Sequence, residues 1–202
     1  MQEGFMQNEQ DRHLFMRCNA IDISAFGELP EGYHLRTCRP EELDIWYGFP
    51  FDTPEDAEKY RSFMQTYFQE VYAGQEERFF AACLFVCDAQ DVPVATGFLW
   101  KRDGHTTVEW IKTKLHAEGQ GIGRALLTAI LRQASAQDMP IYLHTHAGCN
   151  RAVHLYTQFG FEVLTQPMII DDRPNEWQQA LEYLRQVMPE EMYRQLRFTK
   201  YE

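Results

Sequence analysis

Three glycines at alternating positions, Gly119, Gly121 and Gly123, constrain the fold of this chain more than any other feature. They lie where the sequence changes its period: HTTVEWIKTKL before them alternates like a strand, and GIGRALLTAILRQASAQ carries apolar residues at helical spacing. Glycine permits a positive φ and a close approach of the backbone. Successive amides in such a turn can point at one anion, and the following helix N-terminus adds roughly half a positive charge. The segment is therefore predicted to bind a phosphate or pyrophosphate.

Two common phosphate-binding motifs do not fit this segment. A dinucleotide fingerprint needs G-x-G-x-x-G after the first strand of a βαβ unit, whereas here the spacing is G-x-G-x-G and several predicted strands precede it. A P-loop needs G-x-x-x-x-G-K followed by Ser or Thr, and no such lysine follows Gly123. A flexible turn without a ligand is the alternative that the glycines alone leave open.

The periodicity of the whole chain predicts an α/β fold class, with a central mixed, mostly antiparallel sheet and helices on both faces. The expected strands are 33–38, 79–89, 94–102, 105–115, 141–147 and 161–170, with a possible last strand at 196–201. The expected helices are one that opens at 39 and others over 54–73, 121–137, 150–160 and 177–188.

The length of 202 residues suits one domain with an appendage. Residues 1–32 are polar and irregular and are predicted to form an N-terminal arm. Residues 33–170 form the main domain, and residues 171–202 form a helix and strand extension packed on it. The amphipathic helix within 175–188 is a possible homodimer surface.

The charge and the cysteines narrow the function classes. A net charge of −11 argues against nucleic acid as the main partner, because phosphates require a basic surface. We expect no membrane association and no secretory signal, since no run of about 18 apolar residues occurs and the first residues have no basic segment before an apolar stretch. Five cysteines at irregular spacing indicate free, mostly buried thiols in a reducing compartment, the cytoplasm.

Around the glycine turn, the chain resembles the GNAT superfamily of N-acetyltransferases. Their pyrophosphate loop reads [QR]-x-x-G-x-[GA] at the start of a helix, and here it becomes Glu118-Gly119-Gln120-Gly121-Ile122-Gly123. The two motif glycines match, and Gly119 is a frequent companion. Glu118 departs from the family, which prefers Gln or Arg at that position. Because a carboxylate repels a diphosphate, backbone amides and Arg124 would carry the anion.

A second family motif, N-x-x-A-x-x-L-Y-x-x-x-G-F, follows the next predicted strand. It is matched by Asn150, Leu155, Tyr156, Gly160 and Phe161, with Ala152 two positions after the asparagine, where the family varies. The resemblance covers about residues 33–167. Both motifs in order, within the expected series of elements, are far more specific than either alone.

The resemblance implies that a primary amine attacks the thioester of acetyl-CoA directly. It places the pyrophosphate on Gly119, Gln120, Gly121, Ile122, Gly123 and Arg124. The main-chain groups of Ile111 and Thr113 would bond the acetyl carbonyl and the pantetheine arm, and Asn150 would bond that arm too, or serve as the helix N-cap. Tyr156 would donate a proton to the leaving thiolate.

Glu109 is the leading candidate for the base that deprotonates the amine. The segment 108–113 alternates, so we expect Glu109 on the same face as Ile111 and Thr113. His144 and His146 are rivals, since an imidazole pKa suits the task. We expect no metal, because no third ligand has an obvious spacing to these two histidines.

The acceptor is expected to be a small-molecule or peptide amine. The helices over 39–73 shape the acceptor pocket in this family, and here they combine aromatic and acidic residues, which suits a cationic amine. The aromatic candidates and one acid are Trp46, Tyr47, Phe49, Phe51, Asp52, Tyr60 and Tyr67. The alternative function is a regulatory module that keeps the fold and binds acyl-CoA without catalysis.

Overall fold

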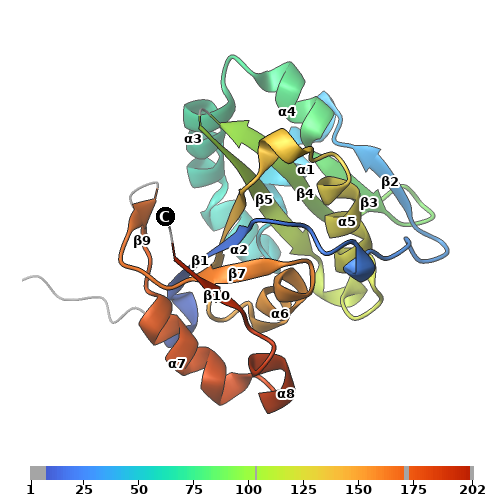
Figure 1. Ribbon diagram of the computed structural model, residues 1–202. Helices are drawn as coiled ribbons and strands as arrows, with labels where there is room; N and C mark the ends of the chain where they lie inside the picture. The colour runs from blue at the N-terminus through green and yellow to red at the C-terminus, as the bar shows by residue number, and fades with distance from the viewer. Residues whose placement is uncertain (1–7, 103, 171–172, 201–202) are drawn as a thin grey trace, which may run out of the picture. The chain divides into compact units, whose positions relative to one another are not determined.

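The computed structural model describes residues 8–102, 104–170 and 173–200. Eight strands are hydrogen-bonded in a mixed, mostly antiparallel sheet with flanking helices, which confirms the predicted α/β fold class (Figure 1). The contacts divide the chain into two compact units. The first unit holds the described residues of 1–25, 102–107 and 136–202, and the second holds those of 26–101 and 108–135. The boundaries predicted at 32 and 170 do not coincide with this division.

The first unit joins the two ends of the chain in one set of strands. Its order is β10-β7-β1-β6, where β1 pairs antiparallel with β6 and β7, and β10 pairs parallel with β7. The strands are β1 (His13–Cys18), β6 (Ile141–His146), β7 (Phe161–Leu164) and β10 (Phe198–Thr199), and a separate pair is β8 (Ile169–Ile170) with β9 (Arg173–Pro174). The helices are α6 (Asn150–Gln158), α7 (Trp177–Val187) and α8 (Glu190–Tyr193).

The prediction of an irregular N-terminal arm is wrong for residues 13–18, which form β1. This strand lies between β6 and β7, and Leu14, Met16 and Cys18 are fully buried. Phe15, on the opposite face, is buried as well. A strand buried on both faces does not alternate between apolar and polar residues, so six residues within a polar stretch gave no period-two signal.

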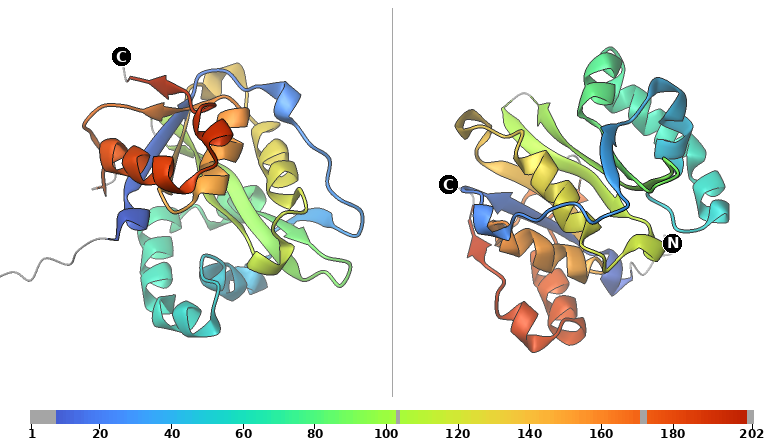
Figure 2. Two further views of the ribbon diagram at one scale, coloured as in Figure 1. Left: turned by 90° about the horizontal axis from the view of Figure 1, so that it is seen from below. Right: turned by 90° about the vertical axis from the view of Figure 1, so that its right-hand side faces the viewer.

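The second unit continues the strand order as β5-β4-β3-β2, and the bonded neighbours β2–β3 and β3–β4 are antiparallel. Its strands are β2 (His34–Thr37), β3 (Leu84–Cys87), β4 (Pro93–Arg102) and most of β5 (His105–Thr113), whose first residues belong to the first unit. Its helices are α1 (Leu43–Gly48), α2 (Pro54–Lys59), α3 (Arg61–Tyr72), α4 (Glu76–Ala82) and α5 (Ile122–Leu131). Helices α1 to α4 gather together, and α5 lies apart from them (Figure 2).

An aromatic core fills the space between α1, α3, α4 and the strands β3 and β4. Its rings meet mostly edge to face, as between Trp46 and Phe79 at 5.0 Å and between Tyr72 and Trp100 at 5.1 Å. Cys83 and Cys87 lie in the same cluster. The other face of β4 packs on α5, because a Cβ at Gly97 would meet the side chain of Ile130 at 3.1 Å. Helices therefore cover both faces of β4.

Several predicted elements differ from the structure. The strand expected over 161–170 ends at Leu164, with Ile169–Ile170 paired separately as β8, and the helix expected over 121–137 ends at Leu131. The helix expected over 54–73 is interrupted at Tyr60, which has φ −101° and ψ 5° and stacks its ring on Phe51 at 5.1 Å. The strand expected over 79–89 begins only at Leu84, because residues 79–82 end α4. Glu76 and Glu77 occupy the first turn of α4, where acidic residues favour the helix dipole. A continuous apolar run has no period that separates strand from helix.

The helix expected over 177–188 is confirmed as α7. Its apolar stripe, Ala180 and Leu184 with Met188 just beyond the end, is buried within the chain. The homodimer proposed for this helix stays a prediction, and its apolar stripe is already covered. The five cysteines are free thiols, four of them buried and Cys149 exposed. Among the described residues, no helix is long and apolar enough to cross a membrane.

Candidate functional site

The glycine turn leads directly into α5. Gly119 and Gly121 have φ values of 77° and 87°, in the left-handed region that favours glycine. The first helical hydrogen bond runs from the Ala125 amide to the Gly121 carbonyl, so the amides of Ile122 and Gly123 lie ahead of it. Such amides point out of the helix N-terminus, where the helix dipole favours a negative charge. The turn thus has the backbone conformation that the sequence predicts for an anion site.

The surroundings of the turn leave room for a ligand. A Cβ added at Gly119 would meet no atom within 4 Å. The Gln120 side chain is turned aside, since its Oε1 accepts a hydrogen bond from the Tyr33 hydroxyl at 3.0 Å and its Nε2 donates to the His116 carbonyl. Glu118 is exposed to solvent. Within this unit the geometry therefore fits an anionic group on the backbone of residues 119–123.

Arg124 lies in the first turn of α5 and packs against a segment that the sequence assigned to the arm. A Cβ at Gly27 would come within 2.8 Å of the Arg124 Cδ, so only glycine fits there without a shift. The Gly27 amide donates to the Thr128 hydroxyl at 3.0 Å. The stem of Arg124 is thereby positioned by residues 26–30, which is a contact that its helical spacing could not reveal.

Strand β5 contains a backbone irregularity at Trp110, whose φ is 53°. Residues other than glycine rarely adopt this conformation, and strained residues concentrate at functional sites. The irregularity breaks the alternation of side chains. Glu109 accepts a hydrogen bond from the Tyr72 hydroxyl at 2.5 Å, and the indole of Trp110 donates to that same hydroxyl at 3.1 Å.

The expectation that Glu109 shares a face with Ile111 is therefore wrong. Ile111 lies on the α5 side, where its Cγ1 would be 2.9 Å from a Cβ at Gly97. Glu109 instead faces the aromatic core, where it contacts Tyr72. The left-handed conformation of Trp110, between Glu109 and Ile111, interrupts the regular alternation of side chains along the strand. Burial and the neighbouring carboxylate raise the pKa of Tyr72, so its hydroxyl remains a donor at neutral pH. No observation tests the role of Glu109 as a base, which stays a prediction.

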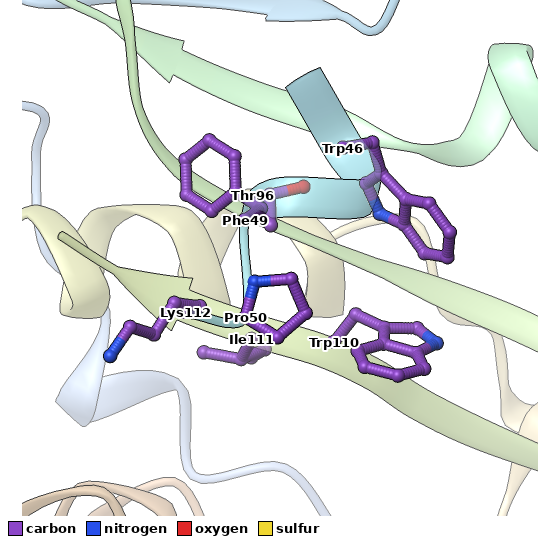
Figure 3. A pocket seen from close by; sticks show the side chains of 7 residues that line it. All are labelled: Trp46, Phe49, Pro50, Thr96, Trp110, Ile111 and Lys112. Atoms are coloured by element: carbon purple, nitrogen blue, oxygen red, sulfur yellow. The ribbon is translucent and has the colours of Figure 1, made fainter. Parts of the chain in front are cut away.

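A cavity of about 130 Å³ lies between the end of α1 and strands β4 and β5 (Figure 3). It is lined by Trp46, Phe49, Pro50, Thr96, Trp110, Ile111 and Lys112. A space of this size accepts a short group, such as the reacting end of a larger molecule.

Two lysines fix the chain next to this cavity. The Lys112 ammonium pairs with Asp52 at 2.8 Å. The Lys114 Nζ donates to the carbonyls of Phe49 and Phe51 at 3.1 and 2.9 Å, and burial lowers its pKa. Lys112 at the end of β5 and Lys114 just beyond it tie this part of the chain to the segment after α1. They hold the aromatic wall of the cavity in place.

The aromatic residues expected to recognise a cationic amine mostly belong to the core. Trp46, Tyr47 and Phe49 are buried, although Trp46 and Phe49 also line the cavity. Tyr60 is 40% exposed. Asp52 is paired with Lys112, so its charge is already compensated. An acidic aromatic recognition surface along these helices therefore stays a prediction.

Asn150 and Tyr156 both lie on α6, in the first unit. Asn150 is half-buried and is the first residue of the helix, while the N-cap is Cys149 without a capping side-chain bond. The suggested N-cap role of Asn150 is thus wrong. Tyr156 is 6% exposed and its ring meets Phe161 edge to face at 6.0 Å.

Tyr156 is almost fully buried, and the described residues give its hydroxyl no hydrogen-bond partner. Burial raises the pKa of Tyr156, which keeps the phenol protonated at neutral pH. A protonated hydroxyl can act as a proton donor.

His144 and His146 lie on β6, where they contact His13 of β1. Burial lowers the pKa of His144 to about 2 and also lowers that of His146. Imidazoles with such low pKa values are weak bases, so His144 is poorly suited to deprotonate an ammonium group.

The family model for "Acetyltransferase (GNAT) family" matches residues 41–161, more than half of the chain. The chain belongs to the GNAT family. The match includes the glycine turn and the motif around Tyr156, as the resemblance implied. A search of curated proteins gave no match.

Solved structures of GNAT proteins share the fold at low sequence identity. A GCN5-related N-acetyltransferase from Sphaerobacter thermophilus is 20% identical, with a TM-score of 0.53 over 76% of this chain and 49% of that one. A GNAT family acetyltransferase from Colwellia psychrerythraea is 17% identical, with a TM-score of 0.54 over 76% of this chain and 53% of that one. A GCN5-related N-acetyltransferase-like protein from Streptococcus suis is 12% identical, with a TM-score of 0.53 over 78% and 61%. The chain thus spans about half of these relatives, and the likeness concerns the fold alone.

Within this GNAT chain, sequence reasoning missed three residues that contact the predicted site residues. The hydroxyls of Tyr72 and Tyr33 donate hydrogen bonds to Glu109 and Gln120. Gly27, which has no side chain, leaves space for the Arg124 side chain. Each lies far from its partner in the sequence and carries no motif. Only an alignment of co-varying positions could have indicated them.

Proposed function

We propose that the protein is an N-acetyltransferase that moves an acetyl group from acetyl-CoA to a primary amine by direct attack within a ternary complex. The observation that carries this proposal is the turn before α5. Gly119 and Gly121 have left-handed backbone conformations there, and the space beside Gly119 is open. Membership of the GNAT family supports it as well.

The backbone of Gly119, Gln120, Gly121, Ile122 and Gly123 would hold the pyrophosphate of the coenzyme. Here the helix dipole replaces part of the hydration of the phosphates. Arg124 would add a positive charge. On the preceding strand, main-chain groups of Ile111 and Thr113 would bond the pantetheine arm and the acetyl carbonyl. Asn150, on α6, is proposed to bond the same arm, as the family resemblance implies.

The amine must lose a proton before it attacks, since primary amines are mostly protonated at neutral pH. We assign the base to Glu109, directly or through a water. Its carboxylate is oriented by the Tyr72 hydroxyl, and the same hydroxyl accepts from Trp110, a residue of the cavity wall. The cavity would hold the reacting end of the acceptor.

The amine nitrogen then bonds the thioester carbonyl carbon, the carbon–sulfur bond breaks, and the thiolate leaves with the electron pair. Tyr156 would give its proton to that sulfur, since its hydroxyl is protonated at neutral pH. The nitrogen loses two protons in all: Glu109 would take the first before attack and pass it to solvent, and the second, lost as the amide forms, would restore the proton that Tyr156 gives to sulfur. Free coenzyme A and the N-acetyl amine are the products.

The acceptor is proposed to be a small-molecule or peptide amine, with no nucleic acid or membrane as partner. A cytoplasmic location is proposed from the free thiols, since such cysteines persist in reducing compartments.

The test combines native mass spectrometry with an assay of thiol release. We expect the purified protein to bind one acetyl-CoA, and to release free thiol with at least one compound of a panel of amino sugars, polyamines, amino acids and peptides. Absence of any coenzyme complex, by mass spectrometry and by calorimetry, would reject the anion site.

A non-catalytic acyl-CoA-binding module is the second candidate, favoured by Glu118 in place of the Gln or Arg of the family loop. Under this hypothesis acetyl-CoA binds but no amine releases thiol. A structure with the coenzyme in which the Glu118 side chain occupies the pyrophosphate position would contradict both candidates.

A further inference from the structure

Three histidines converge on one face of the first unit, apart from the residues assigned to acetyl transfer. Strands β1 and β6 pair antiparallel, with His13 opposite His146 and Phe15 opposite His144. Residues directly opposite each other in such a pair point to the same face. The imidazole centroids of His13, His144 and His146 accordingly lie 4.8–5.1 Å from one another.

The nitrogen atoms of these rings are close to the spacing of a metal site. One ligand atom from each histidine lies within 4.8 Å of the others, and the His13 Nδ1 is 2.9 Å from the His144 Nε2. In a tetrahedral zinc site with bonds of about 2.0–2.1 Å, ligand nitrogens are about 3.4 Å apart. Small rotations of three side chains would therefore create the site, without movement of the paired strands.

We propose that His13, His144 and His146 bind one zinc ion, with water in the fourth position, and that this ion links β1 to β6. Three imidazoles without thiolate suit zinc or a neighbouring transition metal rather than magnesium or calcium, which prefer oxygen ligands. The half-buried rings leave access for the ion. A metal bound across the two strands would stabilise the N-terminal strand in the sheet.

The protonation of the three rings favours metal binding at neutral pH. Burial lowers the pKa of each histidine, so the rings are neutral and their nitrogens can act as ligands. The surrounding charges are balanced: Asp11 and Glu176 raise the histidine pKa values, while Arg173 lowers them, and Arg12 pairs with Glu176 at 2.6 Å.

Arg173 opposes the metal. Its Nη1 lies 3.4 Å from the His144 Nδ1, and because a guanidinium only donates, it favours the His144 proton on Nε2, the atom that faces His13. Zinc must displace that proton. Removal of Arg173 is therefore expected to tighten zinc binding, which is an effect that non-specific binding to surface histidines would not produce.

The sequence alone could not show this site. His144 and His146 stand two residues apart, but the third ligand is 131 positions before His144 and reaches it only because β1 inserts beside β6. Zinc motifs rely on ligands close together in the sequence.

The experiment is calorimetric titration of the metal-free protein with zinc chloride, with magnesium chloride as the ion control. We expect one zinc per chain and no heat with magnesium. His144→Gln and His146→Gln should each weaken binding at least tenfold, as outer-shell changes alone cost 10–100-fold. His154→Gln is the matched control, since His154 is a partly exposed histidine of the same unit that contacts Gln195. Arg173→Ala should bind zinc more tightly than the unchanged protein.

Further measurements separate the proposal from its alternatives. Hydrogen exchange of the amides at 13–18 should slow on adding zinc, and should not do so in His144→Gln. Circular dichroism of each variant without metal shows whether it folds, and His13→Gln offers a further ligand change should one variant unfold. The group of His34, Cys87 and Asp91 is the other cluster with metal-ligand atoms in the described part of the chain. Loss of zinc binding in His34→Gln but not in His144→Gln, or no heat of binding at all, would overturn the proposal.

Discussion

At the scale of single residues, Tyr156 is the sharpest test of the chemistry. Tyr156→Phe keeps the buried ring and its contact with Phe161 but removes the proton. We expect kcat to fall about 100-fold, the lower range for a positioned acid, and the dissociation constant of acetyl-CoA to stay unchanged. Thiol release and calorimetry measure the two quantities. Tyr193→Phe, a half-buried tyrosine of the same unit, is the control; equal turnover in both variants would remove the role from Tyr156.

Two variants can distinguish the role of Glu109 from that of its hydrogen-bond partner Tyr72. Glu109→Gln still accepts from the Tyr72 hydroxyl but cannot take a proton, so we expect kcat to fall about 100-fold with little loss of stability. Tyr72→Phe leaves the carboxylate and removes the donor. It should lower the free energy of unfolding by about 1 kcal/mol and retain most turnover.

Steady-state kinetics and urea unfolding of both variants decide between a chemical and a structural role. If Tyr72→Phe loses as much activity as Glu109→Gln, the carboxylate matters through its hydrogen bond and not as a base.

The residues that the sequence could predict are those set by short local motifs. The sequence indicates that glycine permits a positive φ in this turn, and Gly119 and Gly121 adopt one, because the turn that opens a helix imposes that conformation over a few residues. The histidine neighbours and Tyr72 could not be predicted, because strand pairing and core packing bring them together from distant positions. Local sequence thus indicates where an anion binds, while the partners of the side chains depend on the complete fold.

At the scale of elements, alanine substitutions at two glycines with the same backbone conformation can distinguish an effect on folding stability from an effect on coenzyme binding. Gly119 and Gly74 have φ values of 77° and 78°, and a Cβ at either would meet nothing within 4 Å. Gly119→Ala and Gly74→Ala should therefore each cost about 1 kcal/mol of folding stability through backbone strain. Only Gly119→Ala should weaken acetyl-CoA, by roughly tenfold or ~1.4 kcal/mol, because only it changes the anion-binding turn.

Urea unfolding and calorimetry of these two alanine variants are the measurements. Equal coenzyme affinity would show that the backbone at 119 does not contact the pyrophosphate, whatever happens to stability.

Because of the irregularity in β5, we expect glycine to be more stabilising than alanine at position 110, the reverse of the usual order in a strand. Trp110 contacts Trp46 at 5.4 Å and Tyr67 at 5.2 Å, so its truncation should cost about 3–5 kcal/mol. In a regular strand glycine is worse than alanine, but at a φ of 53° alanine keeps the strain and glycine relieves it. We expect Trp110→Gly to be more stable than Trp110→Ala by about 1 kcal/mol in urea unfolding. The opposite order would mean that the strand relaxes to regular geometry once the ring is removed.

Element types were predicted best where one face is buried and worst where burial is two-sided. The helices α5 and α7 follow their apolar spacing, and β6 alternates regularly in burial. The apolar run before Leu84 divides between α4 and β3, and β1 has buried residues on both faces. Hydrophobic period carries no information in such segments, so their structure depends on what packs around them.

At the scale of the whole molecule, the fold depends on segments from the far ends of the chain. Within the first unit β1 occupies a central position and β10 pairs parallel beside β7. The motifs at 118–124 and 150–161 indicate the family but say nothing about which strand lies between β6 and β7. That position is filled by a segment outside the family match, which begins at residue 41. The central region was predictable because a family motif covers it, and the N-terminal strand was not.

The histidine cluster gives the free energy of unfolding a defined dependence on pH in the metal-free protein. Burial lowers the pKa values of His13, His144 and His146 below the value of 6.5 that an unfolded histidine has. Above pH 6.5 neither state binds the protons, and stability is complete. Below it the unfolded chain takes up protons that the folded chain refuses, so stability falls with falling pH, for His144 down to about pH 2.

At pH 5 the contribution of His144 should reach about 2 kcal/mol, since each pKa unit corresponds to 1.36 kcal/mol. The lowered carboxyl pKa values of Glu176 and Asp91 act only below their ordinary values of 4.5 and 3.8, so the interval from pH 6.5 to 5 isolates the histidines. Urea unfolding with a chelator present should show a shallower loss of stability in His144→Gln than in His154→Gln. Parallel curves for the two variants would mean that the cluster opens to water before it titrates, and that the strand pair of β1 and β6 separates more readily than its burial implies.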